Sequence, residues 1–338
     1  MTRALGPVVL VAALTTAAAA QRSDVPAALA SARRLIESGE ARKAADTLKA
    51  LAVDSDPSSR TSIAQLLGVA YYHAGEPAKA FETLSPIVEL LPVGSVERRE
   101  AEQVLGLSAF LAGRFADAVP WLERTRAWAP DNLQLAHALG QAYIQTQRTD
   151  AARGVFASLY GVSADSAAGH LINAQMMVRL EMEAQAEQEL AKAIERDPRL
   201  PGANFLMGQI ALFRGRVEEA ITLTERELSA NPANAMALSQ LGDAYLRRSK
   251  WDQAIGALQK SIWLNPYYSA PYILLGRAYM KKDQPAAAES MFRRAIEYDP
   301  NNRSAHYLLA QLLQQSGREE EAKREFEIAE RLSGPRGR

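Results

Sequence analysis

Small and apolar residues recur along the chain at helical spacing, and through the second half their pattern repeats every 34 residues. The same three residue types mark successive repeats: Gly242, Ala254 and Pro266, then Gly276, Ala288 and Pro300. A fixed period of this length indicates a stack of similar structural units, each of which buries its apolar face against its neighbours. The chain is therefore predicted to be an all-α solenoid.

Each repeat is predicted to contain two antiparallel helices. When a repeat is numbered from 1 to 34, positions 4, 7, 8 and 11 form one apolar stripe, and positions 20, 24 and 27 form a second. A turn former such as Gly215 separates the stripes, and a pair such as Asn265-Pro266 ends the repeat, because proline cannot donate the helical hydrogen bond. Nine repeats then form a single solenoid over residues 25–336, beginning at Val25, Thr61, Arg99, Leu133, Ala167, Pro201, Ala235, Ser269 and Arg303.

Two stretches depart from the regular spacing. The first two repeats are longer than 34 residues, and a lengthened turn is expected at Gly94-Ser95. The fourth repeat ends in Gly161–Ala164 without a proline, and the fifth carries Asn173 where leucine is usual. This junction is predicted to be either a local kink or hinge, or a degenerate repeat that packs normally.

The first 20 residues belong to a different class of sequence. Arg3 supplies one positive charge, residues 4–20 are uncharged and mostly apolar, and the small residues Ala18 and Ala20 precede Gln21. This layout predicts a signal peptide over residues 1–20, followed by a short segment over 21–24. The mature protein is then expected in the periplasm or outside the cell, without membrane insertion. An uncleaved anchor and an Ala-rich start without a targeting role remain as alternatives.

Composition narrows the chemistry that the chain can perform. Lys plus Arg and Asp plus Glu balance at 39 each, which gives no support to a nucleic-acid partner. The absence of cysteine removes disulfides, thiolate metal sites and a cysteine nucleophile. His137 and His170 fall on consecutive repeats, but two histidines without a third ligand are weak evidence for a metal. No phosphate-binding or hydrolase motif is present. We therefore expect no enzyme activity, no cofactor and no metal.

The register resembles that of the tetratricopeptide repeat family from Val25 almost to the C-terminus. The resemblance implies a right-handed superhelix in which small residues at positions 8 and 20 let the two helices of a repeat approach closely. Four tryptophans lie in or beside second helices, where large rings are expected to seal the groove between repeats: Trp121, Trp128, Trp251 and Trp263.

The resemblance also implies a binding face, because positions 2, 5, 9, 12 and 13 of the first helices line the concave side in this family. Three consecutive glutamines at position 9 can donate to and accept from an extended peptide backbone. The predicted peptide-binding groove comprises Gln141, Gln175, Arg179, Phe205, Gln209, Asp243, Arg247, Arg277 and Lys281. Ile273 and Tyr307 add apolar groups at position 5. The alternative is that these inward-facing polar residues only solvate the face.

These observations favour an exported, non-enzymatic scaffold or adaptor that binds an extended segment of a protein partner in this groove. The alternative is an accessory subunit of a polysaccharide-assembly or outer-membrane secretion complex. Self-association through the terminal repeats stays open. The residues do not name a partner.

Overall fold

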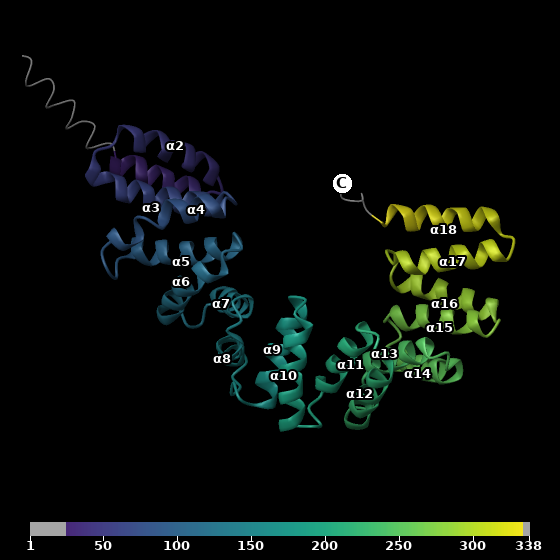
Figure 1. Ribbon diagram of the computed structural model, residues 1–338. Coiled ribbons are helices and arrows are strands. Elements are labelled where there is room, and N and C mark those ends of the chain that lie inside the picture. Colours follow the sequence, from purple (N-terminus) through teal and green to yellow (C-terminus); the bar gives the residue numbers. More distant parts are fainter. Residues whose placement is uncertain (1–24, 334–338) are drawn as a thin grey trace, which may run out of the picture. The chain divides into compact units, whose positions relative to one another are not determined.

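The computed structural model describes residues 25–333, and these residues form helices joined by short connections (Figure 1). The predicted signal peptide and the segment over residues 21–24 lie outside the described residues. The chain divides into two compact halves between Val162 and Ser163, within the junction for which the sequence predicted either a kink or a normally packed repeat. The prediction of a single solenoid from 25 to 336 stays a prediction.

The N-terminal half contains the first four helix pairs. Residues 25–37 are helical, and the following helices are α2 (Ala41–Asp54), α3 (Pro57–His73), α4 (Pro77–Leu84), the short 3-10 helix η1 (Val88–Leu90), α5 (Val96–Leu111), α6 (Phe115–Trp128), α7 (Leu133–Gln145) and α8 (Thr149–Leu159).

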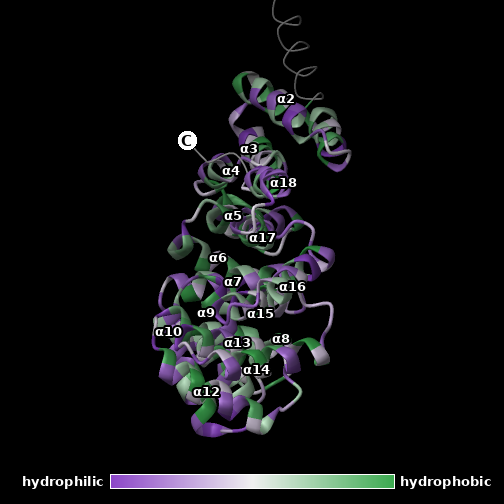
Figure 2. Ribbon diagram, turned by 90° about the vertical axis from the view of Figure 1, so that its right-hand side faces the viewer, coloured by the Kyte–Doolittle hydropathy of each residue, from purple (hydrophilic) through white to green (hydrophobic). Residues whose placement is uncertain are grey.

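The C-terminal half contains five further pairs, in which each odd-numbered helix packs against the helix that follows it. These are α9 (Ala167–Arg179) with α10 (Glu183–Arg196), α11 (Ala203–Phe213) with α12 (Val217–Ala230), α13 (Ala235–Arg247) with α14 (Trp251–Leu264), α15 (Ala270–Lys281) with α16 (Pro285–Tyr298), and α17 (Arg303–Gln315) with α18 (Glu319–Arg331). The helices carry both hydrophilic and hydrophobic residues (Figure 2). The predicted all-α architecture of antiparallel helix pairs is confirmed for the described residues.

Side-chain caps determine where several helices begin. Asn234 and Asn302 accept hydrogen bonds from the N–H groups of Ala237 and Ala305, so α13 and α17 begin at the predicted first residues of their repeats. Helix α3 begins at Pro57, four residues before the predicted start of its repeat, because Asp56 caps it and proline is well suited to a first helical turn.

The two helices of each repeat are in close contact at positions 8 and 20, as their small residues predicted. Position 20 is alanine throughout, with at most 2% of its surface exposed, at Ala44, Ala80, Ala118, Ala152, Ala186, Ala220, Ala254, Ala288 and Ala322. A methyl group added at position 8 would lie 2.5 Å from Leu258 Cγ at Gly242, and 2.5 Å from Phe292 Cε1 at Gly276. These distances are too short for a normal carbon–carbon contact, so the column needs residues without a large side chain.

The turn between the paired helices has the same backbone conformation in every repeat. Position 15 has a positive φ in all nine repeats, and the residue is glycine in five of them. The other four are Gln147, Glu181, Ser249 and Asp283, at φ values of 56–60°. Non-glycine residues are uncommon in this region, and holding one there costs on the order of 1 kcal/mol. The packing of the two helices therefore dictates the turn even where its residue disfavours it.

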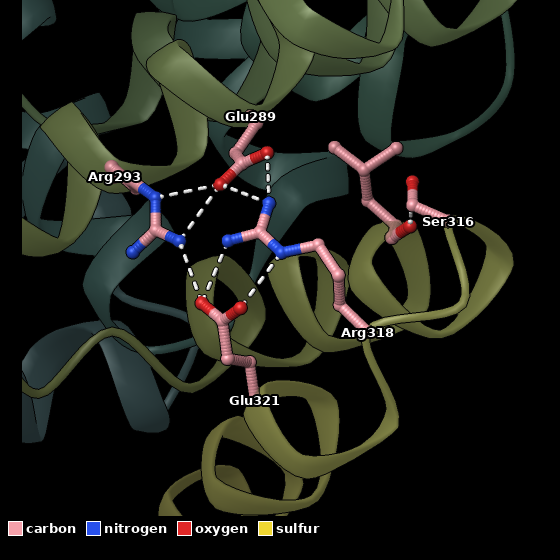
Figure 3. Close-up of polar contacts among 6 residues, drawn as sticks. Glu289, Arg293, Ser316, Arg318 and Glu321 are labelled. Atoms are coloured by element: carbon pink, nitrogen blue, oxygen red, sulfur yellow. Dashed lines mark hydrogen bonds and ion pairs between the residues drawn. The ribbon is translucent and has the colours of Figure 1, made fainter.

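Ion pairs join neighbouring repeats at the turns before several second helices. Arg318, in the turn before α18, donates to both carboxylate oxygens of Glu289 on α16, at 2.9 and 2.8 Å, and to Glu321 (Figure 3). Arg293 also contacts both of these carboxylates. The network spans α16, the turn and α18, and therefore ties the last two repeats together.

Trp263 contradicts the expectation that the tryptophans seal the grooves between repeats. Its side chain is 83% exposed, whereas Trp121 and Trp251 are half-buried. Trp263 lies near the end of α14, and the rest of the described chain covers little of its side chain. Among the described residues, no helix combines the length and the apolar composition needed to cross a bilayer.

Candidate functional site

A groove of about 980 Å³ crosses the first helices of the last four repeats in the C-terminal half. We call it the first-helix groove. Helices α11, α13, α15 and α17 supply nearly all of its lining, and Tyr268 adds a ring from the turn before α15. Its lining is Phe205, Gln209, Leu212, Met236, Ser239, Gln240, Asp243, Tyr268, Ala270, Ile273, Leu274, Arg277, Asn302, Arg303, Ser304, Tyr307 and Leu308.

Four of the nine residues predicted for a peptide-binding groove line this site: Phe205, Gln209, Asp243 and Arg277. The predicted apolar groups Ile273 and Tyr307 line it as well. The remaining predicted residues do not, namely Gln141, Gln175, Arg179, Arg247 and Lys281. Gln141 belongs to α7 of the N-terminal half, and the other four lie on α9, α13 and α15.

Two of the predicted groove residues bind each other. Arg247 donates to Asp243 Oδ2 at 3.0 Å and to the backbone oxygen of Leu212 at 2.9 Å. Asp243 and Arg247 are four residues apart on α13, and opposite charges at this spacing on a helix pair readily. Arg247 therefore connects α13 to the end of α11, and its charge is matched within the protein.

Two arginines in the lining have no such partner. Arg277 of α15 and Arg303 of α17 are exposed, and neither makes a hydrogen bond or ion pair within the described residues. A guanidinium presents a fixed fork of donors that matches a carboxylate or phosphate. The sequence prediction missed Arg303 because position 1 is not among the binding positions that the family resemblance implies.

Apolar and aromatic side chains occupy much of the remaining lining. Met236 and Tyr307 are 53% and 44% exposed, and Phe205, Tyr268 and Ile273 are half-buried. Together they offer an apolar surface to a ligand beside the two free guanidinium groups.

A buried amide stabilises the floor of the groove. Gln240 donates to Thr224 Oγ1 at 2.8 Å and to the backbone oxygen of Phe205 at 3.3 Å, so it links α13 to both α12 and α11. Because its amide hydrogens are used inside the protein, its role is structural. Gln209 is exposed and is the amide that a ligand can reach.

A second polar cluster lies inside the repeat of α9 and α10. Glu189 is 2% exposed, and His170 Nδ1, Asn173 and Lys192 lie 3.0, 3.1 and 3.0 Å from its carboxylate oxygens. Burial alone would raise the pKa of Glu189, but the hydrogen bonds from Asn173, Lys192 and His170 outweigh it and lower the pKa from 4.5 to about 2. Asn173, which broke the sequence pattern, therefore serves a polar core in which the two helices still pack together.

The histidines that the sequence offered as a weak metal pair have other surroundings. His170 contacts Glu189, and the ring of His137 lies 6.0 Å from that of Phe156. Within residues 25–333, no group of three or more His, Asp or Glu side chains has the arrangement of a metal site.

Comparison with known proteins identifies the repeat. Sequence profiles of the tetratricopeptide repeat match residues 109–175 and 279–330, and a second set matches 184–235 and 205–268. No curated protein matches the chain in sequence.

Solved structures with similar folds include the MamA fragment from Desulfovibrio magneticus RS-1, with 21% identity and a TM-score of 0.45, covering 50% of this chain and 96% of that one. YrrB, described as a TPR protein with an unusual peptide-binding site, is 20% identical over 50% of this chain and 87% of its own, with a TM-score of 0.42. The Cut9–Hcn1 hetero-tetramer of the APC/C gives 16% identity and a TM-score of 0.46, over 81% of this chain and 52% of that one. Because the matched profiles span more than half of the sequence and the helix pairs follow the same register, the chain belongs to the tetratricopeptide repeat family.

Proposed function

We propose that the chain is an exported, non-enzymatic scaffold that binds an extended segment of a protein partner in the first-helix groove. The observation that carries this proposal is the lining itself, in which apolar and aromatic side chains surround two arginines without an acidic partner among the described residues. Export is inferred from the signal-like residues 1–20. N-terminal sequencing of protein taken from the cell envelope tests it, with Gln21 expected as the first residue.

The chemistry of the lining suits an extended peptide with mixed side chains. A volume of about 980 Å³ lies at the upper end of the range of about 300–1,000 Å³ that is usual for ligand pockets. Met236, Ile273 and Tyr307 can bury apolar side chains of the segment, while Arg277 and Arg303 can bind a carboxylate. Gln209 can donate to and accept from the peptide backbone.

A selection from random peptides tests the proposal and does not require that the natural partner be identified. Peptides displayed on phage are selected on the purified protein, and the affinity of the enriched sequences is measured by fluorescence anisotropy. We expect an acidic residue beside an aromatic or branched apolar residue. Changing both Arg277 and Arg303 to alanine should weaken binding by about tenfold or more.

The control is Arg226→Ala, which removes an exposed arginine of α12 that also has no partner among the described residues and lies outside the groove. This variant should bind as the wild type does. Arg247 is left intact because it holds Asp243 and the end of α11. Equal affinity of the wild type and the double variant would overturn the assignment of the groove.

A further inference from the structure

A second hollow, of about 670 Å³, lies on the opposite helices of the repeats, between α12 and α14. We call it the second-helix hollow. Leu228 of α12 lies on one side, Leu241 and Tyr245 of α13 form its floor, and Gly256 and Trp263 of α14 lie on the other side. None of these residues lines the first-helix groove, so this surface is independent of the proposed function.

Two small residues of α14 explain why the space is open. Position 23 of the repeat is Leu223 in α12 and Met291 in α16, and Met291 packs against the apolar core beside Leu275. In α14 the same position is Ala257, and the residue before it is Gly256. A Cβ added at Gly256 would meet no atom within 4 Å. The hollow therefore follows from the small residues Gly256 and Ala257, where the repeats on either side carry a larger side chain at position 23.

An exposed tryptophan stands at the rim of this hollow. Trp263 is 83% exposed and lines the hollow together with Gly256 and Lys260. These three residues are spaced by four and then three positions, so they form one stripe along α14. Trp263 and the open seat at Gly256 are seven residues apart, which places a protruding ring and a recess two turns from each other on the same helix face.

We propose that this face binds a second copy of the chain, with α14 antiparallel to α14 of the partner and each Trp263 seated over Gly256 of the other copy. A two-fold axis midway between positions 256 and 263 brings ring and recess together twice, because each residue then meets its counterpart reciprocally. A second copy fits this face because α14 itself carries both halves of the contact, a protruding ring and a recess, on one side of the helix.

The expected dimer is weak. A tryptophan buries about 150–250 Å². Two rings and the two recesses that receive them therefore bury about 600–1,000 Å², which is below the roughly 1,200–2,000 Å² of stable interfaces. Lys260 lies between ring and recess, so the two-fold axis brings it near the partner's Lys260, and like charges oppose the contact. Association should consequently be reversible and should strengthen as salt screens this repulsion.

Sedimentation velocity of the purified protein, at concentrations of about 1–200 µM, tests the proposal in the range expected for a small interface. The wild type should show a monomer–dimer equilibrium. Trp263→Ala should raise the dissociation constant by about tenfold or more. Gly256→Leu should also raise the dissociation constant by about tenfold or more, because the leucine side chain fills the recess. Its melting temperature should stay equal or rise, since leucine is the better helix former and the added Cβ meets open space.

Gly154→Leu is the matched control. Gly154 occupies the same position of its repeat, in α8, and a Cβ there also meets no atom within 4 Å, but residue 161, seven positions later, is glycine. This variant should leave dimerisation unchanged. Lys260→Gln should tighten the dimer and reduce its dependence on salt.

Three results would overturn the proposal. The first is a wild type that remains monomeric over the whole concentration range. The second is a dimer that persists unchanged in Trp263→Ala and Gly256→Leu. The third is an equal loss of dimer in Gly154→Leu, because the effect of leucine would then not depend on the seat.

Discussion

In the C-terminal half, positions 8 and 9 of the first helices differ in how much the residue type can vary. Gly242 and Gly276 face Leu258 and Phe292 so closely that a Cβ has no room, and both repeats have the same residue type at this position. The next residues along, Asp243 and Arg277, line the first-helix groove and carry opposite charges. Packing between paired helices therefore limits one column of the repeat to small residues. The adjacent column is free to vary, and under the proposed function it is the column that sets binding specificity.

The largest expected effect comes from Glu189, a charged residue that is buried between two paired helices where several other repeats carry an apolar residue. Glu189, at position 23, is held in the core by His170, Asn173 and Lys192. Because its pKa is about 2 in the folded protein and near 4.5 when unfolded, the stabilisation is fully present above pH 4.5 and is lost as the pH falls toward 2. The shift corresponds to about 3 kcal/mol.

Urea unfolding of the wild type and of Glu189→Gln at pH 7 and at pH 3 measures this contribution. The variant should be less stable at pH 7, and the difference between the two proteins should narrow at pH 3. Glu195→Gln, a change on the same helix outside this cluster, should match the wild type at both pH values. A difference that does not change with pH would show that the charge of Glu189 contributes nothing.

The next largest effect separates two glycines: replacement by alanine should lower the stability at Gly276 and raise it at Gly256. In Gly276→Ala the new methyl group displaces the buried ring of Phe292, at a cost of about 1–3 kcal/mol that the better helix propensity of alanine offsets by about 1 kcal/mol. Gly256→Ala meets open space and should stabilise the protein by about 0.5–1 kcal/mol. Urea unfolding should therefore separate the two variants by about 2 kcal/mol, and equal stabilities would contradict the packing argument.

The packing of the helix pairs could be predicted from sequence because it is periodic. The alanines at position 20 and the glycines at position 8 recur with the repeat, because in each repeat the two helices approach closely at these positions. The backbone conformation of the turn at position 15 was harder to predict from the sequence. Its positive φ is required by the helix pair, so Gln147 and Glu181 adopt it although their residue types give no signal for it.

The candidate site could be predicted only in part, because its membership depends on contacts that differ from repeat to repeat. The binding positions that the family resemblance implies include Phe205 and Gln209, and both line the first-helix groove. The resemblance could not show that Arg247 binds Asp243 and the end of α11. The sequence gives no signal for the exposure of Trp263, because Trp121 and Trp251 also belong to second helices and are half-buried. Such contacts depend on which residues surround a side chain in the folded protein, and its position in the repeat does not determine them.

The smallest effect on stability is expected for Arg277, the residue beside Gly276, so this position tests the comparison of packing and groove columns most directly. Arg277→Ala removes an exposed side chain with no partner among the described residues, so the free energy of unfolding should change by less than about 0.5 kcal/mol. Affinity for acidic peptides should nevertheless fall, and urea unfolding and anisotropy on the same preparation measure the two quantities. A loss of stability as large as that of Gly276→Ala would mean that Arg277 belongs to the packing of the helices, and the separation of packing and binding columns would then fail.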